Sequence, residues 1–142
     1  MSTRSRIAIE TTDDSGNKVI KSVYCHFDGY FSGVGKTLMK NYQDREKVEA
    51  LISLGDISFI KEEVTPTSSH SFNSPQEGVT VAYHRDRGEK FNPPSINASV
   101  SEFFSSGNES FLYLFTEEGE WLGKESSGFR DPMTLESHFS LQ

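Results

Sequence analysis

The sequence predicts a single α+β domain over residues 1–142, in which a largely antiparallel, twisted sheet is covered on one face by two or three helices. A chain of 142 residues is long enough to build one hydrophobic core. The alternating pattern of Val19–Asp28 is typical of a strand. The polar, glycine-containing segment Thr11–Asn17 predicts the turn of a hairpin, and two runs within 34–54 have helical spacing.

Val19–Asp28 is the predicted central strand, because it has one apolar face and one mixed face. The apolar face is expected in the core and holds Val19, Val23, Cys25 and Phe27. The mixed face holds Ile20, Ser22, Tyr24, His26 and Asp28. Tyr24, His26 and Asp28 therefore form a row of polar groups whose side chains point to the same side.

The first half of the chain contains two further element types. Ser5–Glu10 reads as the strand that pairs antiparallel with the central one. Val34–Tyr42 repeats apolar residues at helical spacing, through Val34, Leu38 and Tyr42. Asp44 predicts the start of a second helix with Val48, Leu51 and Ile52 on its apolar stripe, and Gly55 predicts its end.

The second half has more loops. The predicted elements are a short strand Asp56–Ile60, a mobile surface loop 64–78, a strand Val79–Arg85, a helix Ala98–Phe104, a strand Phe111–Phe115 and its partner at Trp121-Leu122. Asp131-Pro132 predicts the start of a helical turn over Met133–Phe139. Residues 125–142 are expected to pack loosely.

Composition indicates a folded, polar protein outside the membrane. The apolar fraction is 34%, with 11 Phe, 5 Tyr and 1 Trp. No apolar run reaches the ~20 residues that span a bilayer, and the N-terminus lacks the apolar centre of a signal peptide. The single cysteine, Cys25, excludes an internal disulfide and a multi-cysteine zinc site. We expect Cys25 to be a small apolar filler of the core in an intracellular protein.

Charge is unevenly distributed along the chain. The net charge of −7 combines +1 over residues 1–55 with −8 over residues 56–142. A general nucleic-acid binder needs a basic excess, so direct nucleic-acid binding is not expected. The acidic half suits a basic partner, including a nucleic-acid-binding protein, although acidity also serves solubility alone.

Gly33–Thr37 partly matches a phosphate-binding loop because it ends in Gly-Lys-Thr before a helix. The full pattern needs a glycine where this chain has Tyr30, which argues against a nucleoside-triphosphatase. Lys36 and a helix N-terminus can still hold an anion. Otherwise the glycines only form the turn into the helix.

His-x-Asp occurs twice, at His26-Phe27-Asp28 and at His84-Arg85-Asp86. On strands, each pair would present an imidazole and a carboxylate on one face. Neighbouring strands would then form a metal site or an acid–base cluster, whereas separate pairs would only hydrogen-bond locally.

Arginine and tyrosine side chains at the same strand ends suit phosphates and stacked bases. The candidate ligand-binding residues are Arg6, Tyr24, His26, Asp28, Lys36, Tyr83, His84, Arg85 and Arg87. The alternative is that these arginines pair with the chain's many carboxylates. No catalytic residues and no cofactor are predicted.

Three segments, Ser5–Ile9, Tyr24–Tyr30 and Tyr83–Glu89, resemble a family of small proteins encoded by bacteriophages and prophages. The resemblance covers roughly the first 90 residues and the strand Phe111–Phe115. It implies a phage accessory protein in the cytoplasm of an infected bacterium. Such proteins often block a host factor, including CRISPR and other defence systems.

The leading hypothesis is therefore an anti-defence protein, such as an anti-CRISPR protein, that inhibits a host machine by direct binding. Its expected partner-binding residues are Glu117, Glu118, Glu120 and Trp121. The alternatives are a binder that sequesters a nucleotide signal and a metal-dependent enzyme built on the two His-x-Asp pairs.

Overall fold

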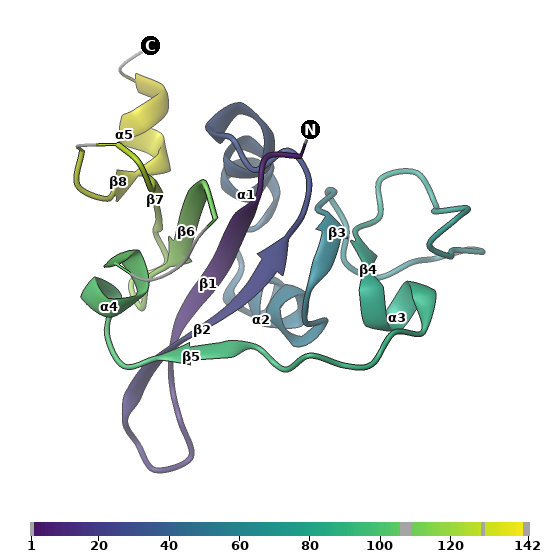
Figure 1. Cartoon of the computed structure of the whole chain (residues 1–142), viewed down its shortest axis with the longest axis horizontal. Helices are drawn as coiled ribbons and strands as arrows, with labels where there is room; N and C mark the ends of the chain where they lie inside the picture. Colours follow the sequence, from purple (N-terminus) through teal and green to yellow (C-terminus); the bar gives the residue numbers. More distant parts are fainter. Residues whose placement is uncertain (1, 106–108, 129, 141–142) are drawn as a thin grey trace.

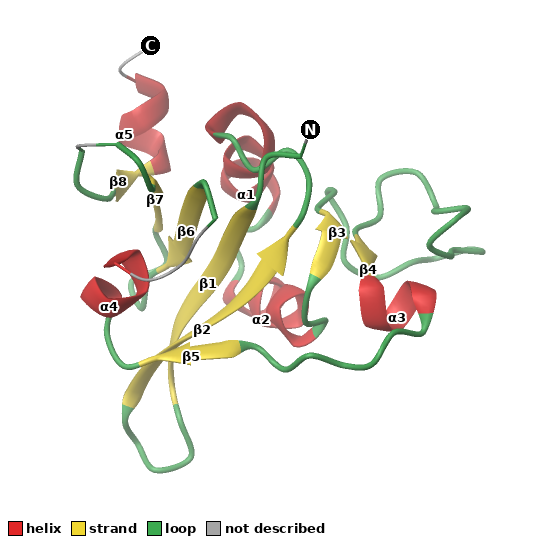
Figure 2. Ribbon diagram, in the orientation of Figure 1, coloured by secondary structure: helices red, strands yellow, loops and turns green. Residues whose placement is uncertain are grey.

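A computed structural model describes residues 2–105, 109–128 and 130–140 of the chain. It confirms the predicted α+β architecture, since one mixed and mostly antiparallel sheet carries helices against it (Figures 1 and 2). The described strands are β1 (Ser5–Thr12), β2 (Lys18–Cys25), β3 (Ile57–Phe59), β4 (Val81–Ala82), β5 (Ser95–Asn97), β6 (Phe111–Phe115), β7 (Trp121–Glu125) and β8 (Met133–Thr134). The described helices are η1 (Phe31–Gly35, a π-helical turn), α1 (Lys36–Asn41), α2 (Arg45–Ser53), α3 (Tyr83–Arg87), α4 (Val100–Ser105) and α5 (Leu135–Ser140).

The strands follow the order β4-β3-β2-β1-β6-β7-β8, and β5 pairs with β2 beside this path. β1 and β2 form the predicted antiparallel hairpin, whose tip projects from the body of the molecule (Figure 2). The Asp13 carboxylate shapes the turn, because it accepts the backbone N–H groups of Ser15 and Asn17. β1 also pairs with β6 in parallel. It therefore lies between β2, which follows it in sequence, and β6, which is distant from it in sequence.

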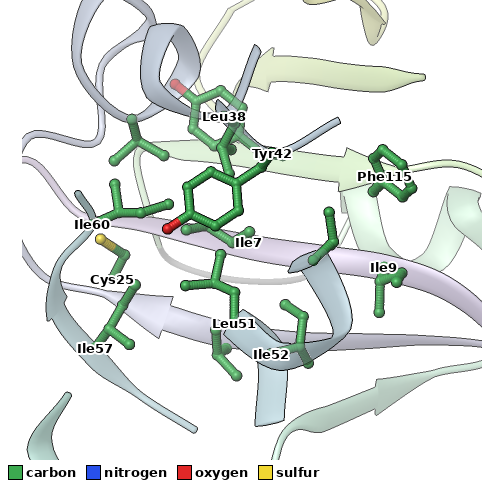
Figure 3. Packing of buried hydrophobic residues seen from close by; sticks show 14 of the residues in the cluster. Ile7, Ile9, Cys25, Leu38, Tyr42, Leu51, Ile52, Ile57, Ile60 and Phe115 are labelled. Carbon is green, nitrogen blue, oxygen red and sulfur yellow. The ribbon is translucent and has the colours of Figure 1, made fainter. Parts of the chain in front are cut away.

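The main core lies between one face of the sheet and the helices α1, α2 and α5. The predicted apolar stripes of the first two helices are confirmed, since Leu38, Tyr42, Val48, Leu51 and Ile52 are all buried (Figure 3). Asp44 caps α2 by accepting the N–H of Glu46, and Gly55 follows the helix at φ +76°. Cys25 is fully buried in this core, and burial raises the pKa of its thiol to about 12.

The opposite face of the sheet is also covered in part. Phe103 of α4 packs there against Ala8, Ile20, Leu112 and Leu114, which form a second, smaller cluster. The predicted mixed face of β2 is therefore buried at its start, because Phe103 of α4 packs on Ile20.

Tyr42, immediately after α1, links three parts of this framework. Its hydroxyl donates to the carbonyl of Lys61 at 2.6 Å, and its own carbonyl accepts the indole N–H of Trp121 at 2.7 Å. Figure 3 shows its ring between the helices and the sheet strands. Burial raises the pKa of Tyr42 to about 12, so its hydroxyl stays a donor at neutral pH.

The predicted strand Val79–Arg85 and the predicted C-terminal helical turn have wrong bounds. The predicted strand Val79–Arg85 is only the two residues of β4, and α3 begins at Tyr83. The Asp86 carboxylate accepts the N–H of Ala82 at 2.7 Å, which favours a helical turn over a continued strand. The C-terminal helix begins at Leu135 and not at Asp131-Pro132, because the Thr134 hydroxyl accepts the N–H of Ser137.

Phe27 was predicted in the core, but its side chain is 42% exposed. β2 ends at Cys25, and the chain turns at Asp28 with φ 58°, in the left-handed region. The alternation that buries Val23 and Cys25 therefore stops before Phe27. None of the described helices is long and apolar enough to cross a bilayer.

The Trp121–Tyr42 hydrogen bond gives a test of the framework. Trp121→Phe removes the indole N–H and leaves the buried carbonyl of Tyr42 without this donor. We expect the free energy of unfolding to fall by about 1–3 kcal/mol. Urea unfolding followed by far-UV circular dichroism measures it. The exposed Tyr30→Phe should stay within about 0.5 kcal/mol of wild type, and an equally small change in Trp121→Phe would contradict the assignment.

Candidate functional site

The two predicted His-x-Asp pairs do not meet. β3 lies between β2 and β4, and His84 and Asp86 stand on α3 rather than on a strand. His26 Nδ1 lies 2.6 Å from the Tyr24 hydroxyl, and His84 Nδ1 lies 2.7 Å from the carbonyl of Glu89. Within the described part of the chain, no three His, Cys, Asp or Glu side chains group as metal ligands. Of the two possibilities that the sequence left open, the structure therefore shows the one in which the pairs are separate.

Asp86 instead belongs to a buried cluster that joins α3 to the loop 64–78. His70 Nε2 lies 3.1 Å from its carboxylate, and the two side chains are 2% and 3% exposed. The Arg85 guanidinium binds the same carboxylate and donates to the carbonyls of Val64 and Thr80. Burial acts to raise the pKa of Asp86, but the hydrogen bonds from Arg85, the N–H of Ala82 and His70 outweigh it and hold this pKa below its usual value.

The His70 ring is oriented by the loop itself. Its Nδ1 accepts the backbone N–H of Gln76 at 2.9 Å, so Nδ1 carries no proton and Nε2 faces Asp86. The backbone N–H of Phe72 donates to the carbonyl of Asp86 at 3.0 Å. The loop 64–78 is thus tied to α3 at several points, and its mobility stays a prediction.

The predicted ligand-binding residues fall into separate groups. Arg6 and Tyr24 are cross-strand neighbours, and His26 follows them in the same row. Asp56 links Tyr83 to Tyr24. Its backbone carbonyl accepts the N–H of Tyr83, and its side-chain carboxylate accepts the N–H of Tyr24. Tyr83 is therefore joined to the Arg6–Tyr24 group through one residue.

The arginines among the predicted ligand-binding residues already have partners within the chain. Arg6 donates to the Ser22 and Ser95 hydroxyls and to the carbonyl of Ser22. Arg87 pairs with Glu89 and lies over the Phe72 ring, 4.2 Å from its centre. Arg6 also lies 3.7 Å from the Glu109 carboxylate, and Arg85 pairs with Asp86, so the contacts agree with the alternative that these arginines pair with carboxylates.

The Gly33–Thr37 segment forms the turn from η1 into α1. A Cβ at Gly35 would lie 3.2 Å from the Tyr113 ring, whose hydroxyl donates to the carbonyl of Gly29 at 2.6 Å. The glycine thus permits close packing of this turn on the sheet. Lys36 is exposed on α1, and Asp28 accepts the Tyr30 hydroxyl.

One end of the sheet gathers carboxylates from distant parts of the sequence. We call this surface the acidic end and define it as Glu10, Asp44, Glu46, Glu49, Glu117, Glu118 and Glu120. Glu10, Glu49 and Glu117 line one cleft of about 260 Å³ together with Lys18 and Arg45. The other members adjoin it on the first turn of α2 and on the β6–β7 turn.

Arg45 holds the acidic end together. Its guanidinium donates to the carbonyl of Glu10 at 3.1 Å and to that of Thr116 at 3.0 Å. The first turn of α2 is thereby fixed against the ends of β1 and β6. The backbone N–H of Glu117 donates to the Glu10 carboxylate, and Lys18 lies 2.5 Å from the Glu117 carboxylate. The hydrogen bond and charge of Glu117 raise the pKa of Lys18.

The acidic end partly matches the predicted partner-binding surface. Glu117, Glu118 and Glu120 lie on it, but Trp121 is 6% exposed and packs its ring 5.1 Å from that of Phe115. The prediction that Trp121 is an exposed contact residue is wrong. The carboxylates that residues 1–55 contribute to the acidic end were not predicted. The net charge of that half is +1, and this sum does not show where its individual carboxylates lie. The parallel β1–β6 pairing brings Glu10 beside the β6–β7 turn.

A different cleft of about 380 Å³ opens over Phe31, beside β7 and α5. Its lining includes Met133 and His138, and the His138 ring lies 3.8 Å from that of Phe31. Burial, aided by the charge of Arg130, lowers the pKa of His138. No sequence pattern indicates this cleft, since the sequence predicts loose packing of residues 125–142. Residues 129, 141 and 142 of that segment lie outside the described residues.

Comparisons with known proteins gave no matching family model, no matching curated protein and no matching solved structure. The resemblance of Ser5–Ile9, Tyr24–Tyr30 and Tyr83–Glu89 to phage-encoded proteins therefore stays a prediction.

The Asp86 cluster predicts a dependence of stability on pH. Because the pKa of Asp86 is lowered on folding, its contribution is present at neutral pH and is lost as the pH falls below its usual value of 3.8. Asp86→Asn should be less stable than wild type at neutral pH and should lose less stability between about pH 5 and about pH 3. Chemical unfolding at each pH measures this.

Asp14→Asn is the matched control, since Asp14 is exposed at the tip of the β1–β2 hairpin. It should keep the acid slope of the wild type. An Asp86→Asn variant with the wild-type slope would show that Asp86 does not contribute in this way.

Proposed function

We propose that this protein acts by direct binding and presents its acidic end to a basic partner. The observation that carries this proposal is the convergence of Glu10, Glu49 and Glu117 on one cleft, with further carboxylates on the adjoining turns. Two cations, Arg45 and Lys18, stand among these carboxylates, and Lys18 is paired with Glu117. The surface is acidic because its carboxylates outnumber these cations.

Such a surface favours a partner with a basic patch. Complementary charge raises the rate of encounter and selects against acidic surfaces and nucleic acids. The carboxylates stand on a rigid framework, because Arg45 and the β1–β6 pairing fix the elements that carry them. Little ordering of the acidic end is therefore needed on binding.

The resemblance to phage-encoded proteins supports a more specific proposal. The partner is a host protein of a defence or nucleic-acid-processing machine, which the protein inhibits in the cytoplasm of an infected bacterium. Proteins that act on nucleic acids carry basic surfaces, and the acidic end would compete for such a surface.

A triple charge reversal tests this proposal. Glu117→Lys, Glu118→Lys and Glu120→Lys together should abolish capture of a basic host protein and any rise in phage plating on a defended bacterium. The measurements are affinity purification from infected cells and plating efficiency with the protein expressed.

The matched control is Glu62→Lys, Glu63→Lys and Glu77→Lys, which makes the same change in net charge at exposed positions elsewhere. It should bind and inhibit like the wild type. Equal activity of both triple variants would remove the acidic end from the mechanism.

The cleft over Phe31 favours a second candidate, a binder that sequesters a small ligand such as a nucleotide. Its volume of about 380 Å³ falls in the range of small-molecule sites, and two aromatic side chains, Phe31 and His138, line it. A ligand at 100 times its Kd should stabilise the fold by about 2.7 kcal/mol. Thermal shift with a nucleotide panel measures this, and Met133→Trp, which fills the cleft, should remove the shift.

A further inference from the structure

An apolar cleft of about 320 Å³ lies next to the acidic end, between α2 and the segment that leads into β5. Ile9 and Ile52 supply apolar walls from β1 and α2, and Phe91 and Pro94 supply the opposite wall. Lys21 and Glu49 are the charged residues of its lining. We call it the Phe91 cleft.

The wall formed by residues 91–94 is held in place by specific contacts. Gly55, at φ +76°, leaves room for Phe91, whose ring would lie 3.0 Å from a Cβ at that position. The Asn92 side chain donates to the Asp56 carboxylate at 2.8 Å. The segment then enters β5, which pairs antiparallel with β2. The Phe91 cleft is thus part of the folded framework.

Two large apolar side chains face solvent here: Phe91 lines the cleft, and Ile96 lies beside it, next to the lining residue Lys21. Phe91 is 39% exposed and Ile96 is 56% exposed. Ile96 lies directly opposite Lys21 in the β2–β5 pair, so both side chains point to the same face of the sheet, the face that carries the cleft. Exposed apolar residues gathered at a cleft are typical of a protein-binding surface.

The Phe91 cleft adjoins the cleft of the acidic end that Glu10, Glu49 and Glu117 line. Thr11 and Glu49 line both of them. A chain segment lying along this surface would therefore pass from apolar walls to the carboxylates of Glu10 and Glu117. This juxtaposition defines what the surface can accept.

We propose that this combined surface binds a basic segment of the partner protein that carries one apolar side chain flanked by arginine or lysine. The leucine- or phenylalanine-sized side chain enters the Phe91 cleft, and the flanking cations lie along the acidic end. The inference rests on the proposed function and names the kind of partner segment that the acidic end takes. Charge complementarity selects a basic protein segment over a nucleic acid or an anionic membrane.

The test uses the full chain and three synthetic peptides as probes. The first has a leucine flanked by two arginines on each side, the second replaces the leucine with serine, and the third replaces the arginines with glutamates. Titration followed by amide NMR shifts gives the affinities. We expect the first peptide to bind at least five times more tightly than the second and the third not to bind. The shifted amides should include Thr11, Glu49 and Ile52.

Two variants locate the apolar contact. Phe91→Ala and Ile96→Ser should each reduce binding of the leucine peptide towards that of the serine peptide. Phe27→Ala and Tyr30→Ala are matched controls, because these residues are 42% and 41% exposed away from this cleft, and they should bind like wild type. Circular dichroism checks that each variant is folded.

The outcomes separate this inference from the proposed function. Equal affinity for the leucine and serine peptides, with Phe91→Ala binding like wild type, would overturn the apolar contact but not the binding of basic segments at the acidic end. Failure of both basic peptides to bind would count against this inference and against the proposed function. If the Glu117, Glu118 and Glu120 reversal weakens both basic peptides while Phe91→Ala weakens only the leucine peptide, both contacts are supported.

Discussion

The fold depends on the burial of Tyr42 at the junction of α1 and α2. Its ring fills the space between these helices and the sheet, its hydroxyl binds the chain after β3, and its carbonyl binds Trp121 of β7. One residue thereby fixes the helical layer to both halves of the sheet. The chain then enters α2, whose first turn carries Asp44 and Glu46 to the acidic end and is held there by Arg45. The anchor of the core and the candidate surface are therefore neighbours along the chain.

Local patterns predicted much of this framework. Asp13 and Gly16 indicated the β1–β2 hairpin, and the Asp44 cap and Gly55 correctly bounded α2. These signals work because capping and turn formation depend on residues a few positions apart. The burial of Tyr42 also followed from its spacing with Val34 and Leu38. The parallel pairing of β1 with β6 had no such signal, since it joins segments about a hundred residues apart.

Not all the features that sequence reasoning missed depend on such distant contacts. α3 replaced a predicted strand because the Asp86 carboxylate accepts the N–H of Ala82, four residues earlier, while Arg85 and the more distant His70 contact the same carboxylate. The other missed features are distant in origin. Trp121 is buried because Tyr42 supplies an acceptor for its indole. The acidic end was only half predicted, because a charge count by halves of the sequence hides carboxylates that folding brings together. Composition indicated that the candidate surface is negatively charged. It did not indicate where on the fold this surface lies or that the apolar Phe91 cleft lies beside it.

The burial of Cys25 makes the chain convenient to label. A thiol with a pKa of about 12 and no exposed surface forms little thiolate at neutral pH, and thiolate is the form that reacts with maleimides and other thiol reagents. Because Cys25 is the only cysteine in the chain, a second one placed on the surface would react alone while the fold is intact. A fluorophore or spin label could then be attached at one chosen position without first removing the native cysteine from the core.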